Sequence, residues 1–310
     1  MGNEKPFRTH NQMLKILRDR NMEVPTSAKR ILERENYYCI INGYKDLFLK
    51  PESEIETYID GTSFYDVYTL FLFDRELRSI LFPTIIQAES YIKSLLAYYF
   101  HLHHPEKNSF LAFENYRQDN SYAGKVLKTI STLSCCISNQ KNNAVTYYID
   151  TYQHCPLWVL TNFLTFGQIS KMFAVCSPDI RLDISKHFSK DYGREYKIRV
   201  HFSAEMLDEA IGALVMIRNC CAHDERLYNY KTKAKTRALS KALNARFIDE
   251  NRLFTSIVFL KIFLTKKDYR RLIRKISNLF KTYDSKFNVI SLDDIKEVVG
   301  YQQAWIDANL

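Results

Sequence analysis

Apolar residues recur at helical spacing through the first third of the chain. From Ser63 to Pro83 they fall every three or four positions, and from Pro83 to Tyr99 they form a cleaner stripe with a period near 3.6 residues. The two stripes comprise Val67, Leu70, Phe71, Leu77 and Leu81, then Ile85, Ala88, Ile92, Leu95, Leu96 and Tyr99. Because proline lacks an N–H and clashes with the preceding turn, Pro83 is expected to end the first helix or to kink it.

Helical spacing and capping residues predict helices along most of the remaining chain. Residues 203–222 form the clearest one, with Ser203 as the N-cap and Leu207, Ile211 and Leu214 on its buried side. Further helices are expected at 10–20, 28–35, 125–134, 140–153, 157–163, 167–176, 178–188, 252–264 and 267–282, with a last helical turn at 291–294. The polar stretch 101–124 is expected to be a loop that has room for one short helix. No segment is confidently predicted as a strand, so the predicted fold is all-α.

Composition agrees with a helical globular protein and sets its organisation. The 310 residues include only 8 Gly and 7 Pro, so helix breakers and tight turns are few. Residues 1–50 are expected to form a small helical N-terminal segment, residues 60–282 a multi-helix domain, and residues 283–310 a C-terminal tail. Residues 51–62, which are acidic and polar, connect the first two parts.

Cysteine usage and hydropathy indicate a cytoplasmic protein that does not contact a membrane. Seven cysteines without a C-x-x-C motif are best explained as reduced thiols. The N-terminus has no apolar signal core, and no apolar run is long enough to span a bilayer. Although three histidines crowd positions 101–104, only Glu106 lies near them as a further ligand. We therefore expect neither a metal ion nor another cofactor.

A candidate catalytic motif stands at the end of the predicted helix 203–222. It consists of Arg218, Asn219 and His223 in an Arg-x4-His pattern with Asn directly after Arg. RNA is cut without a metal when its own 2′-hydroxyl attacks the phosphorus, and histidine can move the protons that this step requires. Arginine remains charged and can stabilise the phosphorane oxygens, while an amide can orient the phosphate or the imidazole. The alternative interpretation is that Arg218 pairs with a nearby acid and His223 simply ends a helix.

Helix geometry limits how one motif can work. Asn219 and His223 are four residues apart and share a face, whereas Arg218 and His223 lie roughly 140° apart around the axis. Arg218 must therefore reach across, or a second copy of the motif in a homodimer must complete the site. A second match, Arg181-x5-His187, lacks the adjacent Asn and is interpreted as a coincidence.

The charge of the chain favours a polyanionic partner. The formal net charge is +9, and such a field attracts nucleic acid over long distances. Basic residues are concentrated directly after the motif, at Arg226, Lys231, Lys233, Lys235, Arg237 and Lys241. They do not follow one helical stripe, so they either surround an RNA backbone or solvate a surface helix. We favour contact with RNA, because the backbone of a substrate has to lie near His223.

The sequence as a whole resembles abortive-infection proteins of the AbiD/AbiF type, a bacterial anti-phage family within the HEPN superfamily. The most diagnostic block is Arg218 to His223 followed by Arg226-Leu227-Tyr228-Asn229. The other matching pieces are Lys5-Pro6, Leu17 to Arg20, Asn36-Tyr37-Tyr38, Gly43-Tyr44, Phe48, Tyr68, Phe73-Asp74-Arg75, Leu77-Arg78, Glu89, Ile92-Lys93, Pro156-Leu157-Trp158 and Phe166-Gly167. Asn21, where the family has Gly, and the approximate closing element from Gly300 to Trp305 depart from the pattern without touching the motif.

The resemblance implies a function and partners. It implies a HEPN-like fold and an endoribonuclease toxin that cuts RNA and arrests growth during phage infection. It also implies a small structured antitoxin RNA as a partner, and a homodimer in which two motifs face each other. Two alternatives remain open, namely a non-catalytic RNA-binding module and a scaffold of a defence complex.

Three structural expectations accompany these predictions. Asp74 and Arg78 are four residues apart on a helix and should form an ion pair. Glu89 interrupts an apolar stripe, so we expect it to be buried against Arg75 or Arg78. The tyrosines at positions 37, 38 and 44 are expected to belong to the core.

Overall fold

A computed structural model of the chain describes residues 6–309, apart from residues 52, 54, 233–236 and 246–251. Within these residues the chain forms α-helices, short 3₁₀- and π-helical turns and isolated β-bridges, and no strand. The all-α prediction is therefore confirmed. Buried side chains from Leu14 to Ile306 belong to one continuous hydrophobic core.

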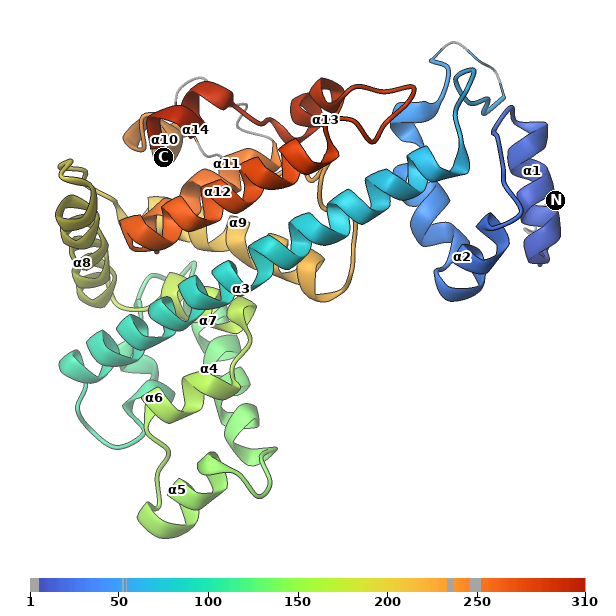
Figure 1. Cartoon of the computed structure of the whole chain (residues 1–310). Coiled ribbons are helices and arrows are strands. Elements are labelled where there is room, and N and C mark those ends of the chain that lie inside the picture. The colour runs from blue at the N-terminus through green and yellow to red at the C-terminus, as the bar shows by residue number, and fades with distance from the viewer. Residues whose placement is uncertain (1–5, 52, 54, 233–236, 246–251, 310) are drawn as a thin grey trace.

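The long helix α3 (Phe64–His103) is the central element of the molecule (Figure 1). It begins at a capping box, in which the Ser63 hydroxyl accepts a hydrogen bond from the Asp66 N–H at 3.2 Å and the Asp66 carboxylate accepts one from the Ser63 N–H at 2.8 Å. Its buried residues include both apolar stripes predicted from the sequence, apart from the half-buried Tyr99. The two stripes therefore belong to a single helix of 40 residues.

Pro83 lies inside α3, so the expectation that a helix ends there is wrong. The missing N–H of Pro83 leaves the carbonyl of Ser79 without its helical donor. Both Pro83 and Ser79 are exposed, so water can hydrate that carbonyl. The apolar side chains on the opposite face continue to pack on both sides of the proline, which keeps the helix intact.

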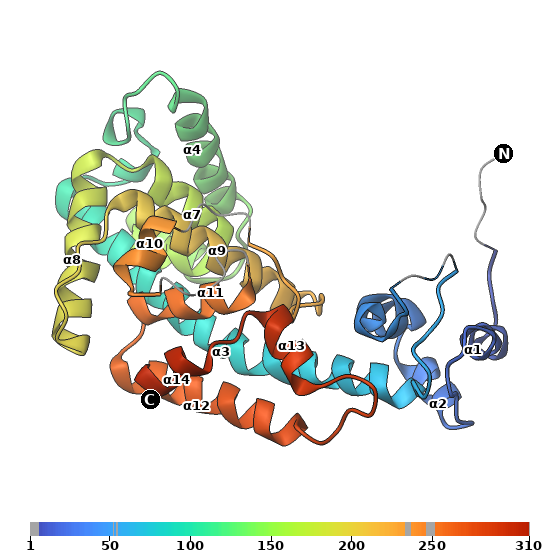
Figure 2. The same cartoon turned by 90° about the horizontal axis from the view of Figure 1, so that it is seen from above.

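The N-terminal elements gather at one end of α3 (Figures 1 and 2). They are α1 (His10–Asp19), α2 (Ala28–Arg34), a π-helical turn at Tyr38–Asn42 and a 3₁₀ turn at Asp46–Phe48. The Phe64 N–H donates to the Glu23 carbonyl at 2.8 Å, and Arg75 of α3 pairs with Glu35 at 2.5 Å. These contacts attach the N-terminal segment to the start of α3.

The remaining helices surround α3 on two sides, and Figure 2 shows α4 and α12 on opposite sides of it. The first group comprises 3₁₀ turns at Ser109–Leu111 and Phe113–Asn115, then α4 (Ala123–Ser138), α5 (Ala144–Tyr152), α6 (Leu157–Leu160), a 3₁₀ turn at Thr161–Phe163 and α7 (Phe166–Val175). The second comprises α8 (Pro178–Tyr196), α9 (Ala204–Ala222), α10 (Arg237–Ala242), α11 (Leu253–Phe259), a 3₁₀ turn at Leu260–Ile262, α12 (Lys266–Tyr283), α13 (Leu292–Val299) and α14 (Gln303–Asn309).

Most predicted helices are present, and the differences lie at some helix ends and in the C-terminal part. Helix α8 continues to Tyr196 rather than ending near residue 188. The C-terminal part forms two helices, α13 and α14, where only one turn was expected. In the basic stretch 231–246 the described residues contain only the six-residue α10, and residues 233–236 and 246 lie outside the described part of the chain.

Candidate active site at the end of α9

Helix α9 carries the candidate catalytic motif, and local signals fix its start and direction. The Ser203 hydroxyl accepts a hydrogen bond from the Met206 N–H at 3.2 Å, as expected of an N-cap. Leu207, Ile211 and Leu214 are buried, as the sequence predicts. The opposite face is exposed at Met216, Asn219 and His223, which follow one another at intervals of three and four residues. Asn219 and His223 therefore share the solvent-facing side of α9.

The chain reverses direction directly after the motif. His223 is the C-cap of α9, and its N–H donates to the Asn219 carbonyl at 2.9 Å. Asp224 adopts the left-handed conformation with φ 54°, and the Glu225 N–H donates to the Cys220 carbonyl at 2.9 Å. This six-residue closure is typical of a Schellman motif, with aspartate in the position that glycine usually takes. The turn presents His223 at the surface.

Arg218 extends toward α3 rather than toward His223. About a quarter of its side chain (26%) is exposed, its Nε lies 3.6 Å from Glu89 Oε2, and its guanidinium lies 5.9 Å from the Phe82 ring centre. Neither Arg218 Nε nor Glu89 Oε2 makes a hydrogen bond to a described residue, although both atoms are buried. The pair is therefore an electrostatic contact without directional hydrogen bonding.

Glu89 is buried as predicted, but its expected partner was wrong. Its carboxylate pairs with Lys93 at 2.7 Å and approaches Arg218, and does not pair with Arg75 or Arg78. Arg78 lies eleven residues earlier on α3, about 16 Å along the helix axis, which is beyond side-chain reach. The sequence signal that identified Glu89, a carboxylate inside an apolar stripe, could not name a partner from another helix.

The three candidate residues are close in sequence but do not form one hydrogen-bonded group. No hydrogen bond joins any two of their side chains among the described residues, and Arg218 faces α3 while Asn219 and His223 face solvent. The arrangement contains both features of the non-catalytic alternative, an acid beside Arg218 and a histidine at a helix end. It also agrees with the predicted geometry, in which Arg218 and His223 of one chain lie on different sides of α9.

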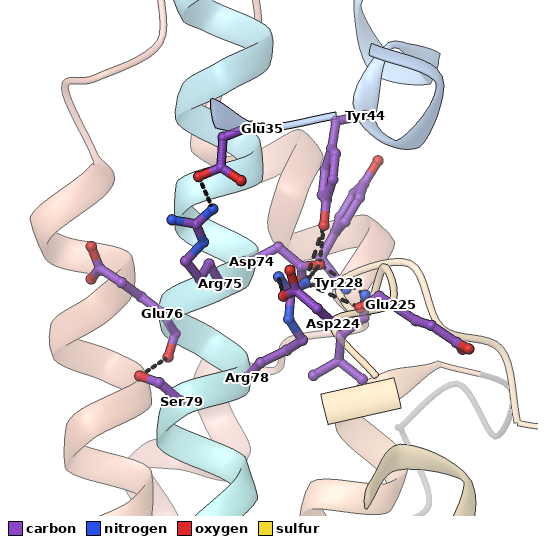
Figure 3. A network of polar contacts seen from close by, with 11 residues as sticks. Glu35, Tyr44, Asp74, Arg75, Glu76, Arg78, Ser79, Asp224, Glu225 and Tyr228 are labelled. Carbon is purple, nitrogen blue, oxygen red and sulfur yellow. Dashed lines mark hydrogen bonds and ion pairs between the residues drawn. The ribbon is translucent and has the colours of Figure 1, made fainter. Parts of the chain in front are cut away.

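A buried carboxylate fixes the loop that follows the motif (Figure 3). Asp74 of α3 is fully buried and accepts hydrogen bonds from the Leu227 N–H at 2.8 Å and the Tyr228 N–H at 2.7 Å. It also accepts from the Tyr44 hydroxyl at 2.7 Å, and forms the predicted ion pair with Arg78 at 2.7 Å. One carboxylate thus joins the N-terminal segment, α3 and the loop after His223.

Arg78 extends the same network to the turn itself. Its guanidinium pairs with Asp224 at 2.5 Å and donates to the Glu225 carbonyl at 3.1 Å (Figure 3). Burial raises the pKa of Asp74, and the charge of Arg78 together with the two backbone N–H donors opposes that effect. The pKa of Tyr44 is also raised, because its hydroxyl is buried beside the Asp74 carboxylate. Sequence reasoning found the Asp74–Arg78 pair but not its connection to the motif.

The residues predicted to contact RNA lie in different surroundings. Arg226 donates to the Gly43 carbonyl at 2.5 Å and pairs with Asp46 at 2.8 Å, so it already links the loop to the N-terminal segment. Lys231 and Lys241 are exposed. Arg237 is the first residue of α10. Lys233 and Lys235 lie outside the described residues.

Other candidate residues have structural partners. Arg181 is buried and pairs with Asp208 at 2.8 Å, and His187 contacts the hydroxyls of Tyr91 and Tyr99. The two residues of this second Arg–His match therefore bind different partners.

Of the three clustered tyrosines, Tyr44 is buried, Tyr37 is half-buried and Tyr38 is exposed. The expectation that all three belong to the core is therefore wrong for Tyr38.

The histidines near the end of α3 and the cysteines of the motif are the remaining groups with possible site chemistry. His103 contacts Asp183 at 2.9 Å, and no group of His, Cys, Asp or Glu residues able to hold a metal ion occurs in the described part of the chain. Burial raises the pKa of Cys220 to about 11 and that of Cys221 to about 12, so both are protonated thiols near neutral pH. Neither cysteine is therefore a thiolate nucleophile near neutral pH.

The fold and the motif define a helical protein with a polar site at one helix end, and comparison with known families identifies its relatives. The sequence model of the Abi-like protein family matches residues 30–229, which include the motif, Asp74, Arg78 and Glu89. The chain belongs to this family, and membership associates it with abortive infection. Comparisons with curated proteins and with solved structures gave no match. Among the described residues, none of the helices combines the length and the apolar character that a membrane crossing requires.

Proposed function

We propose that the chain is an endoribonuclease of the HEPN type that acts in abortive infection, with Arg218, Asn219 and His223 as its catalytic residues. The observation that carries the proposal is the exposed Asn219–His223 edge of α9 at a helix end that the Asp74 network fixes, with Arg218 preceding Asn219 on the side of α9 that faces α3. A fixed polar edge suits catalysis, because reacting groups must be held in place before the substrate arrives.

The proposed reaction uses the 2′-hydroxyl of the substrate as the nucleophile and needs no metal ion. The 2′-oxygen attacks the adjacent phosphorus and loses its proton, the bond to the 5′-oxygen breaks, and that oxygen gains a proton. His223 is assigned to proton transfer, Arg218 to the charge on the phosphorane oxygens, and Asn219 to orientation of the phosphate. The products are a 2′,3′-cyclic phosphate and a 5′-hydroxyl.

We further propose that two copies of the chain form the complete site. Arg218 and His223 of one copy lie on different sides of α9, so the arginine of one copy is best able to serve the histidine of the other. A mixture of Arg218→Ala and His223→Ala chains tests this directly. If the two copies share sites, mixing restores roughly a quarter of the parent activity, since half of the dimers are mixed and each has one intact site. No recovery on mixing would contradict the shared site.

A small structured RNA is the proposed restraint on this activity. Such a partner agrees with the net charge of +9 and with the exposed Lys231 and Lys241 close to the motif. A second candidate function, an RNA-binding module without catalysis, is favoured by one observation, namely that Arg218 lies against Glu89 rather than beside His223.

The deciding experiment compares cleavage of total cellular RNA by the parent chain, His223→Ala and His201→Ala in the presence of a chelator. His201 is exposed and lies before α9, so its variant controls for the removal of a surface imidazole. The proposed function predicts cleavage by the parent and by His201→Ala, and none by His223→Ala. If none of the three cuts while all bind a structured RNA, the binding module is the correct function.

A further inference from the structure

A groove opens along the C-terminal half of α3, where α6 and the turn Thr161–Phe163 lie beside it. It has a volume of about 710 Å³. Two large aromatic side chains in its wall are exposed, Tyr98 by 60% and Trp158 by 50%. His101 also lines the groove and meets the Trp158 ring edge-on, with 5.2 Å between the ring centres. Rings exposed in this way present faces on which a flat molecule can stack.

The groove is connected to Arg218 of the candidate active site by two ion-pair contacts along α3. Lys93 forms part of its wall and pairs with Glu89 one helical turn away at 2.7 Å. Glu89 in turn lies 3.6 Å from Arg218. A molecule in the groove would therefore lie on the same helix as the carboxylate that contacts the arginine assigned to the scissile phosphate.

We propose that this groove binds single-stranded RNA beside the cleavage site, with unpaired bases stacked on Trp158 and Tyr98. The inference rests on the proposed function and adds the substrate class. Aromatic platforms bind unpaired bases, whereas the bases of a duplex are stacked on each other and cannot be inserted between protein rings.

The other residues of the groove suit the same ligand. The Ser94 hydroxyl and the Asn162 amide oxygen can bond to the edges of bases, since both residues are exposed. Lys93 also lines the groove, where it is paired with Glu89. Exposed rings together with hydroxyl and amide groups are the kind of surface on which unpaired bases stack.

The tryptophans of the chain allow stacking to be measured without cleavage. The chain contains only two, and Trp305 is 5% exposed, so Trp158 is the residue whose emission a ligand in the groove can change. Titration of the full chain with a 2′-O-methyl oligonucleotide, which cannot be cut, should quench the fluorescence. The same titration of Trp158→Phe, which retains only the buried Trp305, should leave the emission unchanged.

Affinity measurements with the same oligonucleotide give a second readout. Loss of the ring in Trp158→Ala should raise the Kd about tenfold, as expected when one stacked base loses its platform. Trp158→Phe should have an intermediate Kd, because a smaller ring still stacks. Tyr147→Ala, which removes an exposed aromatic residue from α5, should match the parent.

Three results would contradict the proposal that the groove binds single-stranded RNA. The first is an oligonucleotide that binds Trp158→Ala as tightly as the parent. The second is an oligonucleotide that fails to bind the parent at all. The third is a Trp158→Ala variant with an altered oligomeric state in solution and an unchanged RNA affinity. That result would show that this face is an interface between copies of the chain. If the parent chain does not cut RNA but still binds the oligonucleotide with quenching of Trp158, the result would contradict the proposed ribonuclease activity. RNA binding in the groove would remain supported.

Discussion

Glu89 links α3 to Arg218 of the candidate site. Its carboxylate is nearly buried, lies between Lys93 and Arg218, and is the nearest acidic group to the guanidinium. A carboxylate in this position can hold the arginine in place without a fixed hydrogen bond. We propose Glu89 as a positioning residue, since it would act on an RNA substrate only through Arg218.

The variant Glu89→Gln tests this role at the scale of a single residue. It keeps the shape of the side chain but removes the charge that attracts Arg218. We expect kcat for RNA cleavage to fall roughly tenfold with little change in KM, because a misplaced arginine weakens stabilisation of the transition state. Glu114→Gln, at an exposed position, is the matched control and should behave as the parent. An unchanged kcat, or a rise in KM alone, would contradict the assignment.

At the scale of elements, the loop after α9 is held by contacts with α3 as well as by its own turn. Asp74 satisfies two backbone N–H groups of this loop, and Arg78 holds the turn at Asp224. Helix α3 therefore fixes the position of His223 from outside α9. A change in α3 should be able to disturb the site while the motif itself remains intact.

The paired variants Asp74→Asn and Asp224→Asn separate the buried contact from the exposed one. Asp74→Asn leaves Arg78 without its buried partner and turns an amide toward two N–H donors, so we expect a loss of about 3–5 kcal/mol in the free energy of unfolding. Asp224→Asn should cost less than about 1 kcal/mol, because its side chain is 66% exposed and asparagine tolerates the left-handed conformation. Urea unfolding of both variants gives the comparison. Equal losses would show that Asp74 does not anchor the loop.

Pro83 offers a prediction about α3 alone. Alanine at this exposed position restores the helical N–H and removes the clash with the preceding turn. We expect Pro83→Ala to raise the free energy of unfolding by about 1–3 kcal/mol, as judged from the cost of proline inside a helix. A loss of stability in thermal or urea unfolding would show that the ring makes a packing contact that outweighs the missing hydrogen bond.

Sequence patterns predicted what depends on local signals. The start of α9 at Ser203 and its end at His223 follow from a cap and a turn within the same segment. The passage of α3 through Pro83 was not predictable, because it depends on which side of the helix faces water. The Glu89–Arg218 contact and the donors to Asp74 join distant parts of the chain, and a periodic pattern contains no information about such pairings.

At the scale of the whole molecule, the proposed RNA partner should be held mainly by charge. We expect log Kd for a structured RNA to change linearly with log salt concentration. The double variant Lys231→Gln, Lys241→Gln should lower the slope by about 0.7–0.9 for each phosphate that the protein no longer neutralises. The double variant Lys141→Gln, Lys190→Gln, which changes two other exposed lysines, is the control and should keep the parent slope. Equal slopes in all three chains would exclude Lys231 and Lys241 from RNA contact.

The chemistry of the cut ends tests the central claim most directly. Parent chain and RNA would be incubated in chelator, and the new termini would be mapped on a substrate and on its analogue with a single 2′-deoxynucleotide at the cleavage position. The account predicts 2′,3′-cyclic phosphate and 5′-hydroxyl ends, and no cut at the 2′-deoxy position. Ends with a 5′-phosphate, or cleavage that continues at the 2′-deoxy position, would contradict a reaction in which the 2′-hydroxyl attacks and His223 moves the protons.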